Sequence, residues 1–161
     1  MRVQVHRRWG VTLLELAIAV VLLVLLMMLA VPSMSGVLAD RRLRKSLDSF
    51  NAIVREAQER SMAERRPYLI VWQDGQIGLR PEGFLKGDNP EPEMKLKIAK
   101  DESFRVSFPA ALIDDAPAEW IFWPSGNCEP AVVSYQGRDG KWTANYSALT
   151  ARSETVSYVA K

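Results

Sequence analysis

One carboxylate, Glu15, stands at the head of an apolar stretch where an ionised group is costly. The residues from Leu16 to Ala39 carry no charge. An ionised side chain at the centre of a membrane helix costs roughly 2.5–3.5 kcal/mol on insertion scales, so it is retained where it meets an opposite charge or serves a function. The chemistry that Glu15 predicts is therefore pairing with a cation rather than catalysis.

The rest of the chain lacks the residue sets that catalysis or metal binding usually needs. Its only histidine, His6, lies in a short basic leader, Met1 to Gly10, and its only cysteine is Cys128. Without the leader the chain has no histidine, which excludes Ser-His-Asp catalysis, Cys-His catalysis and histidine-based metal sites. It contains no phosphate-binding loop and no dinucleotide glycine motif. The sequence therefore predicts a protein that is not an enzyme and holds no metal or cofactor.

Two smaller features have a chemical and a structural interpretation. The acidic pairs Asp114-Asp115 and Glu91 with Glu93 suit a metal or acid–base site, but both lie beside prolines in predicted loops, where solvated charge is the ordinary interpretation. Cys128 is a reactive thiol only where a nearby group lowers its pKa, and the sequence offers no obvious one. We expect solvated loop charges and a buried, unreactive cysteine.

Three interpretations compete for residues 1 to 39. A cleaved secretory signal explains the basic leader and the apolar run, but the run is long and begins beside Glu15. A plain single-pass anchor explains the length, because the 24 residues from Leu16 to Ala39 span about 36 Å as a helix and a hydrocarbon core measures roughly 30 Å. Neither interpretation explains Glu15 together with Gly10.

The third interpretation explains both residues. The run Gly10-Val11-Thr12-Leu13-Leu14-Glu15, followed by the apolar stretch, resembles the class III signal of type IV pilins and type II secretion pseudopilins. The resemblance implies that a prepilin peptidase cuts between Gly10 and Val11 and that the new amine of Val11 is methylated. Val11 replaces the phenylalanine usual at that position. Pro32 falls where the family commonly has a helix-bending proline.

The spacing of Val11 and Glu15 agrees with this resemblance. The two residues are four apart and lie on one helix face, and a free α-amine is largely cationic at neutral pH. Glu15 can pair with the amine of its own chain or with that of a neighbouring subunit, and the second pairing also fixes the axial register of a filament. The resemblance implies a single-pass protein of the bacterial inner membrane with a periplasmic head. It also implies four kinds of partner: other pilin or pseudopilin subunits, the prepilin peptidase and methyltransferase, inner-membrane lipid and the inner-membrane assembly platform.

The charge of the chain depends on the leader. The formal net charge is +2, and loss of the three leader arginines would leave −1, so the basic character is weak evidence for a nucleic-acid partner. The leader arginines favour a cytoplasmic N-terminus. The basic cluster from Arg41 to Lys45, just past the apolar run, opposes that bias. The cluster has two interpretations, a site for acidic lipid head groups and a solvated helix face.

A helical pattern continues beyond the apolar run. Steps of four and three residues place one apolar stripe on a helix, made of Leu43, Leu47, Phe50, Val54 and Ala57. Pro67 ends the pattern. A single helix from Val11 to Arg66 would span about 84 Å, with a bend at Pro32. We expect the stripe to pack on the chain's own sheet, because three turns of heptad are too few to favour a coiled-coil partner.

From Pro67 onward the chain shows short strand patterns separated by turn residues. We expect strands at 68–72, 76–80, 94–98, 104–108, 119–123, 131–135, 142–146 and 155–159, with hairpin turns at Asp74-Gly75 and Asp139-Gly140. The predicted fold class is α+β, a long N-terminal helix packed on an antiparallel β-sandwich head. The predicted domains are a leader (1–10), a transmembrane or filament-core helix (11–39), an amphipathic helix (40–66) and a periplasmic head (67–161).

One head motif narrows the resemblance. The run Trp120 to Trp123, followed by Pro124-Ser125-Gly126 and a strand, resembles the strand–Pro-x-Gly–strand signature of the minor pseudopilin H and FimT-like group. Pro124 presets φ for a tight turn and Gly126 supplies a positive φ. That group commonly has a Thr-Gly turn before the last strand, and the corresponding segment from Leu149 to Arg152 lacks the glycine. The resemblance implies a minor pseudopilin of a type II secretion system, most like the H-type subunit.

The alternative function is a FimT-like minor pilin or membrane-anchored module that binds DNA or another ligand through its head. Arg138, Lys141 and Arg152 beside Trp142 would supply cationic contacts and base stacking. The near-neutral charge without the leader argues against nucleic acid. We expect the aromatic strand residues to fill the core rather than a partner-binding face: Trp120, Trp123, Tyr135, Trp142 and Tyr146.

Overall fold

The computed structural model describes residues 12–83, 92, 94–109 and 119–161, without the side chains of residues 29–35. The chain divides into two compact units, Met1–Val37 and Leu38–Lys161. Helix α1, Leu13–Glu64, provides the described part of the first unit and the first element of the second. The predicted loops that carry Asp114-Asp115 and Glu91 with Glu93 lie outside the described residues.

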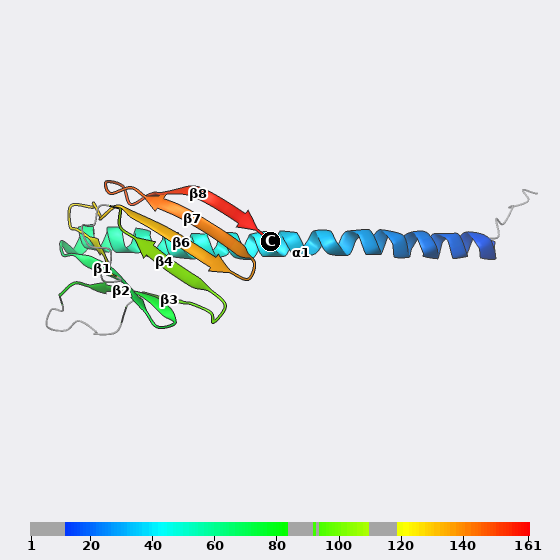
Figure 1. Ribbon diagram of the computed structural model, residues 1–161, viewed down its shortest axis with the longest axis horizontal. Helices are drawn as coiled ribbons and strands as arrows, with labels where there is room; N and C mark the ends of the chain where they lie inside the picture. The colour runs from blue at the N-terminus through cyan, green and yellow to red at the C-terminus, as the bar shows by residue number, and fades with distance from the viewer. Residues whose placement is uncertain (1–11, 84–91, 93, 110–118) are drawn as a thin grey trace, which may run out of the picture. The chain divides into compact units, whose positions relative to one another are not determined.

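The second unit contains two antiparallel sheets of four described strands each. The first sheet has the order β3-β2-β1-β5, with β1 at Tyr68–Gln73, β2 at Gln76–Pro81, β3 at Met94–Lys97 and β5 at Glu119–Phe122. The second has the order β4-β6-β7-β8, with β4 at Ser103–Ser107, β6 at Ala131–Gly137, β7 at Gly140–Tyr146 and β8 at Ser153–Ala160. Figure 1 shows the strands gathered around the C-terminal half of α1. The predicted α+β fold is confirmed.

The amphipathic half of α1 packs on both sheets through the predicted stripe. Leu43, Phe50, Val54 and Ala57 are at most 2% exposed, and Leu47 is half-buried against the same core. The helix ends at Glu64 because Arg65 takes a φ of 54° and Pro67 follows two residues later. The prediction that the stripe packs on the chain's own sheets is confirmed.

An aromatic cluster joins the helix to the sheets. The ring of Phe50 lies within 5.7–6.1 Å of four other rings, those of Trp72, Phe104, Trp142 and Tyr146. Two of the buried aromatic side chains donate hydrogen bonds to α1. The indole N–H of Trp142 donates to Ser46 Oγ at 2.8 Å, and the hydroxyl of Tyr146 donates to Asn51 Oδ1 at 2.7 Å. Buried aromatic side chains are stable when their polar atoms are satisfied in this way. The expectation that aromatic residues fill the core is confirmed, with Trp123 only half-buried.

One of the two predicted hairpin turns is displaced. Asp74-Gly75 forms the first turn as predicted, with Gly75 at a φ of 75°. In the second hairpin the turn residues are Arg138 and Asp139, and Gly140 begins β7 opposite Gly137. A Cβ atom at Gly140 would lie 2.2 Å from the carbonyl oxygen of Val159. Gly140 is therefore needed for the close approach of two strands rather than for the turn itself.

Candidate functional site

Glu15 lies in the first turn of α1, where Thr12 caps the helix. The backbone N–H of Glu15 donates to Thr12 Oγ1 at 3.2 Å, and the N–H of Leu16 donates to the carbonyl oxygen of Thr12 at 3.2 Å. Thr12 and Glu15 therefore occupy the first and last positions of a capping box, and a carboxylate here also complements the helix dipole. The Thr-x-x-Glu spacing is the sequence signal from which this cap could be predicted. Gly10 and Val11 lie outside the described residues, so cleavage, methylation and amine pairing stay predictions.

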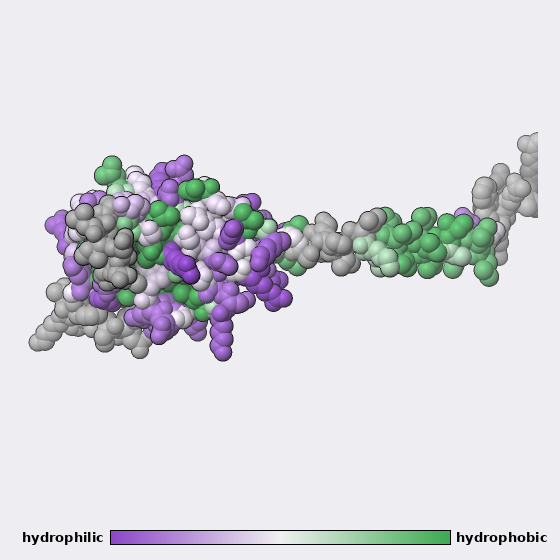
Figure 2. Space-filling model, in the orientation of Figure 1, coloured by the Kyte–Doolittle hydropathy of each residue, from purple (hydrophilic) through white to green (hydrophobic). Residues whose placement is uncertain are grey.

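The apolar segment of α1 has no partner among the described residues. Its large apolar side chains from Leu13 to Met28 are 45–88% exposed, and Figure 2 shows them as a continuous hydrophobic surface along the helix. A helix that is apolar all round is stable only when lipid or protein covers it. Within the described part of the chain, no helix meets the combined length and hydropathy of a membrane span. The side chain of Pro32 lies outside the described residues, so the predicted bend stays a prediction.

Asp40 lies near the start of the second unit and links α1 to β8. The hydroxyl of Tyr158 donates to Asp40 Oδ1 at 2.9 Å, and Arg44 Nε donates to Asp40 Oδ2 at 3.0 Å. The hydrogen bond from Tyr158 and then that from Arg44 hold the pKa of the Asp40 carboxyl below its usual value. Arg42 Nη1 lies 3.4 Å from Asp139 Oδ1 in the β6–β7 turn. Two arginines of the basic cluster therefore pair with acidic residues of the second unit.

We predict that Asp40→Asn lowers the stability of the head at neutral pH but not in acid. A carboxyl whose folded-state pKa is depressed stabilises the fold above its unfolded pKa, and this contribution is lost as the pH falls through the folded-state value. The usual pKa of this carboxyl is 3.8, so the difference in stability between the two proteins is expected at pH 7 and should vanish well below pH 3.8. Urea unfolding at several pH values measures it, and an equal deficit at all pH values would contradict the prediction.

Pro124 and Gly126 lie in a tight turn that closes against α1. Gly126 takes a φ of 85°, and its N–H donates to the carbonyl oxygen of Trp123 at 2.9 Å. The carbonyl oxygen of Gly126 accepts a hydrogen bond from Gln58 Nε2 at 2.6 Å. A Cβ atom at Gly126 would lie 2.7 Å from the sulfur of Met62. The turn therefore needs glycine both for its backbone conformation and for its contact with the helix.

The loop between β7 and β8 adopts a glycine-type conformation without glycine. Ala151 takes a φ of 50°, its N–H donates to the carbonyl oxygen of Ser147 at 2.9 Å, and the N–H of Ser147 donates to the carbonyl oxygen of Arg152 at 3.1 Å. Ala151 stands where the resemblance leads us to expect the glycine of a Thr-Gly turn. The chain thus has a positive φ at a residue that is not glycine.

We predict that Ala151→Val lowers the free energy of unfolding by about 2 kcal/mol, because a β-branched residue tolerates a left-handed conformation poorly. Ala151→Gly is the matched control. Relief of strain there is offset by the greater flexibility of glycine in the unfolded chain, so we expect a change within about 0.5 kcal/mol. Urea unfolding measures both variants, and equal destabilisation by glycine and valine would show that the φ of residue 151 does not decide the outcome.

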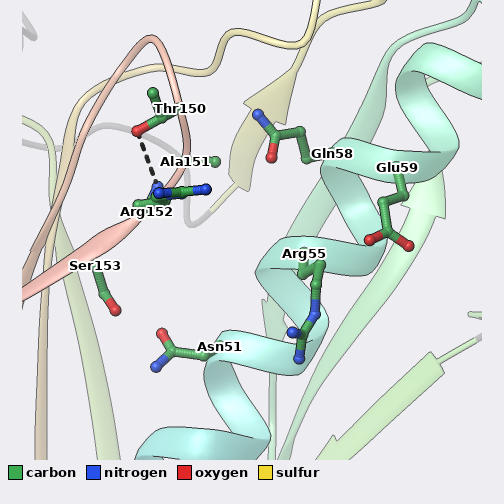
Figure 3. A pocket seen from close by; sticks show the side chains of 8 residues that line it. All are labelled: Asn51, Arg55, Gln58, Glu59, Thr150, Ala151, Arg152 and Ser153. Atoms are coloured by element: carbon green, nitrogen blue, oxygen red, sulfur yellow. Dashed lines mark hydrogen bonds between the residues drawn. The ribbon is translucent and has the colours of Figure 1, made fainter.

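A groove of about 470 Å³ lies between α1 and the β7–β8 loop (Figure 3). Arg55, Gln58 and Glu59 line it from the helix, and Figure 3 shows Arg152 extending towards them from the loop. Asn51 also borders the groove, where its Oδ1 accepts the hydrogen bond from Tyr146. The lining offers charged and hydrogen-bonding groups of both signs.

The structure does not assemble the predicted DNA-binding patch. Trp142 is completely buried and has no face free for base stacking. Arg138 lies in the β6–β7 turn and Lys141 at the start of β7, whereas Arg152 follows the other end of that strand. These residues therefore do not form one surface that combines cations with an exposed aromatic ring.

The remaining chemical candidates are a buried thiol and two acidic pairs. Cys128 is 2% exposed, and its Sγ lies 3.5 Å from the carbonyl oxygen of Ser147. Burial raises the pKa of the Cys128 thiol to about 11, which keeps it protonated at neutral pH. The acidic pairs Glu91 with Glu93 and Asp114-Asp115 lie outside the described residues, so their interpretation as solvated loop charges stays a prediction.

The architecture is a long N-terminal helix whose second half packs on antiparallel sheets. The chain aligns with the crystal structure of the minor pseudopilin EPSH from the type II secretion system of Vibrio cholerae with a TM-score of 0.54 and 11% identity, over 76% of this chain and 98% of that one. It aligns with the type IV minor pilin FimU of Pseudomonas aeruginosa with a TM-score of 0.52 and 14% identity, over 71% of this chain and 88% of that one. No family model and no curated protein sequence matches the chain. The resemblance to pilin-like proteins is confirmed at the level of the fold, and a fold alone does not define function.

Proposed function

We propose that this chain is a minor pseudopilin or minor pilin, most like the H-type subunit of a type II secretion system. A prepilin peptidase removes residues 1–10, and Val11 becomes the methylated N-terminus. The apolar part of α1 holds the subunit in the bacterial inner membrane with its head in the periplasm, and later packs in the core of a short filament. The peptidase and methyltransferase, membrane lipid, the assembly platform and other filament subunits are its partners.

One observation carries this proposal. A helix segment with 45–88% exposed large apolar side chains precedes a head that has its own closed core. Such a segment requires lipid before assembly and neighbouring helices afterwards, and Glu15 at its start supplies the one charge that can select a partner amine. The fold similarity to a minor pilin and a minor pseudopilin, over 71% and 76% of this chain, supports the same role.

The work of the subunit in this proposal is mechanical rather than catalytic. The described grooves contain no histidine, and the buried thiol of Cys128 has a raised pKa. Binding of DNA through the head is the second candidate function. The burial of Trp142 removes the stacking on which that candidate depends, so the assembly role is preferred.

Cell fractionation tests the proposal. The full chain, expressed at native level in a bacterium with its secretion or pilus system, should sediment with the inner membrane, and its head should be cleaved by protease only after the outer membrane is opened. When the major subunit is overproduced, part of the chain should move to the sheared filament fraction. Recovery of the chain from the cytosol, or its absence from filaments that otherwise assemble, would contradict the proposal.

A further inference from the structure

Charge is unevenly distributed over the second unit. Of the 21 basic and 19 acidic residues, the leader holds three arginines and the apolar segment holds Glu15, so residues 38–161 carry 18 of each and are formally neutral. Cations nevertheless gather at one end of this unit. There the β6–β7 turn meets the first turns of α1 after Leu38, as Figure 1 shows. We name this end the basal surface and define it by six exposed residues: Arg41, Lys45, Lys97, Arg138, Lys141 and Lys161.

Contacts with Asp139 show that residues far apart in sequence meet at this surface. Arg42 pairs with the Asp139 carboxylate at 3.4 Å, and the backbone N–H of Lys161 donates to the Asp139 carbonyl oxygen at 3.0 Å. A groove of about 260 Å³ has Lys45, Lys97 and Asp139 in its lining. A second groove of about 220 Å³ has Lys141 and Lys161 in its lining. The basal surface therefore combines α1, β3, the β6–β7 hairpin and the residue after β8.

Three acidic residues at this end, Asp40, Asp139 and Glu102, are already engaged in hydrogen bonds. Asp40 accepts from Arg44 and Tyr158, Asp139 accepts from Arg42, and Glu102 accepts the hydroxyl of Tyr135 at 2.9 Å. Within the described residues, none of the six basal cations forms an ion pair. The surface therefore presents unpaired positive charge to the solvent.

We infer that the basal surface binds the phosphate groups of anionic lipid head groups. The inference rests on the proposed function, because a membrane-held apolar segment brings the residues from Asp40 onward to the head-group layer. Lys and Arg side chains near an anionic leaflet are attracted to it over about one Debye length, roughly 8 Å at physiological salt. The basal surface begins directly after the apolar stretch in the sequence, which favours lipid over an acidic protein as its ligand. Trp142 is buried, so a nucleic acid would have no aromatic ring on which to stack.

Energy transfer between the head and the bilayer tests the inference with the full chain. Gln136 is exposed beside the basal grooves, and Cys128 is buried, so Gln136→Cys provides a single reactive thiol for a donor dye. The labelled chain is reconstituted in vesicles of phosphatidylcholine alone or with about 30% phosphatidylglycerol, each with a lipid-linked acceptor dye. A donor on Leu149→Cys, in the loop that follows the far end of β7, serves as the positional control.

We expect transfer from position 136 to be about twofold higher with phosphatidylglycerol at low salt, and the excess to disappear at about 0.5 M salt. The double variant Arg138→Gln/Lys141→Gln should lose most of that excess, whereas Arg55→Gln/Arg152→Gln, which removes the same charge elsewhere, should keep it. Equal transfer in the two lipids would overturn the inference and leave the surface to an acidic protein. Failure of the chain to float with any vesicle would instead contradict the proposed function itself.

Discussion

Glu15→Gln is expected to leave the chain folded and inserted in the membrane but to reduce its incorporation into filaments at least about tenfold. Removing one member of a desolvated ion pair costs about 3–5 kcal/mol, because the other charge is left without compensation. Glutamine keeps the size of the side chain and also serves at the last position of a capping box, so the start of α1 should persist. The measurement is the amount of the variant in the sheared filament fraction relative to the amount in the membrane.

Thr12→Ala separates the charge of Glu15 from its role in the cap. This variant loses the hydroxyl that accepts the Glu15 N–H, at a cost of about 1 kcal/mol to the first turn, but keeps the carboxylate. If pairing with an amine governs assembly, Glu15→Gln and Glu15→Ala should fail to assemble while Thr12→Ala assembles. Normal incorporation of Glu15→Gln would show that the charge is dispensable in this chain.

Phe50→Ala is expected to lower the free energy of unfolding of the head by about 3–5 kcal/mol. Phe50 is completely buried, and its ring contacts aromatic rings from both sheets, so the cavity would open at the centre of the core. A loss of this size is a large part of the 5–15 kcal/mol typical of a domain. Urea unfolding of the full chain in detergent, followed by tryptophan fluorescence, measures it.

The matched control for this core variant is Leu149→Ala. Leu149 is 80% exposed, so its truncation should change the free energy of unfolding by less than about 0.5 kcal/mol. A cost below about 1 kcal/mol for Phe50→Ala would mean that the head is held by contacts other than the helix–sheet cluster described above.

The local features of the fold could be predicted from the sequence because they depend on neighbouring residues. The stripe through Phe50 follows from helical spacing, and the turn at Asp74-Gly75 follows from the two residues that form it. The division of the strands into two sheets could not be predicted, because β1 pairs with β5 across about fifty residues and no local pattern encodes that partner. The displacement of the second hairpin turn has the same origin, because the backbone of Val159, distant in sequence, leaves no room for a side chain at Gly140.

The candidate site shows the same division. The sequence indicates Glu15 as a functional residue because a charge in an apolar run is costly. The hydrogen bond to Thr12, which caps the helix, is seen only in the structure of the first turn of α1. The positive φ of Ala151 could not be predicted, because alanine rarely adopts this conformation. The basal surface brings Lys45 of α1 beside Lys97 of β3 through tertiary contacts alone, so the sequence indicates only the cluster from Arg41 to Lys45.

The central claim is that this chain is processed and assembled as a pilin-like subunit, and mass spectrometry of its N-terminus tests that claim most directly. The protein is isolated from its native membrane and its N-terminal peptide is sequenced. We predict a chain that begins at Val11 with a methylated α-amine, since only cleavage after Gly10 creates the cation that Glu15 is placed to meet. An intact Met1, or a start near Ser35, would contradict the account.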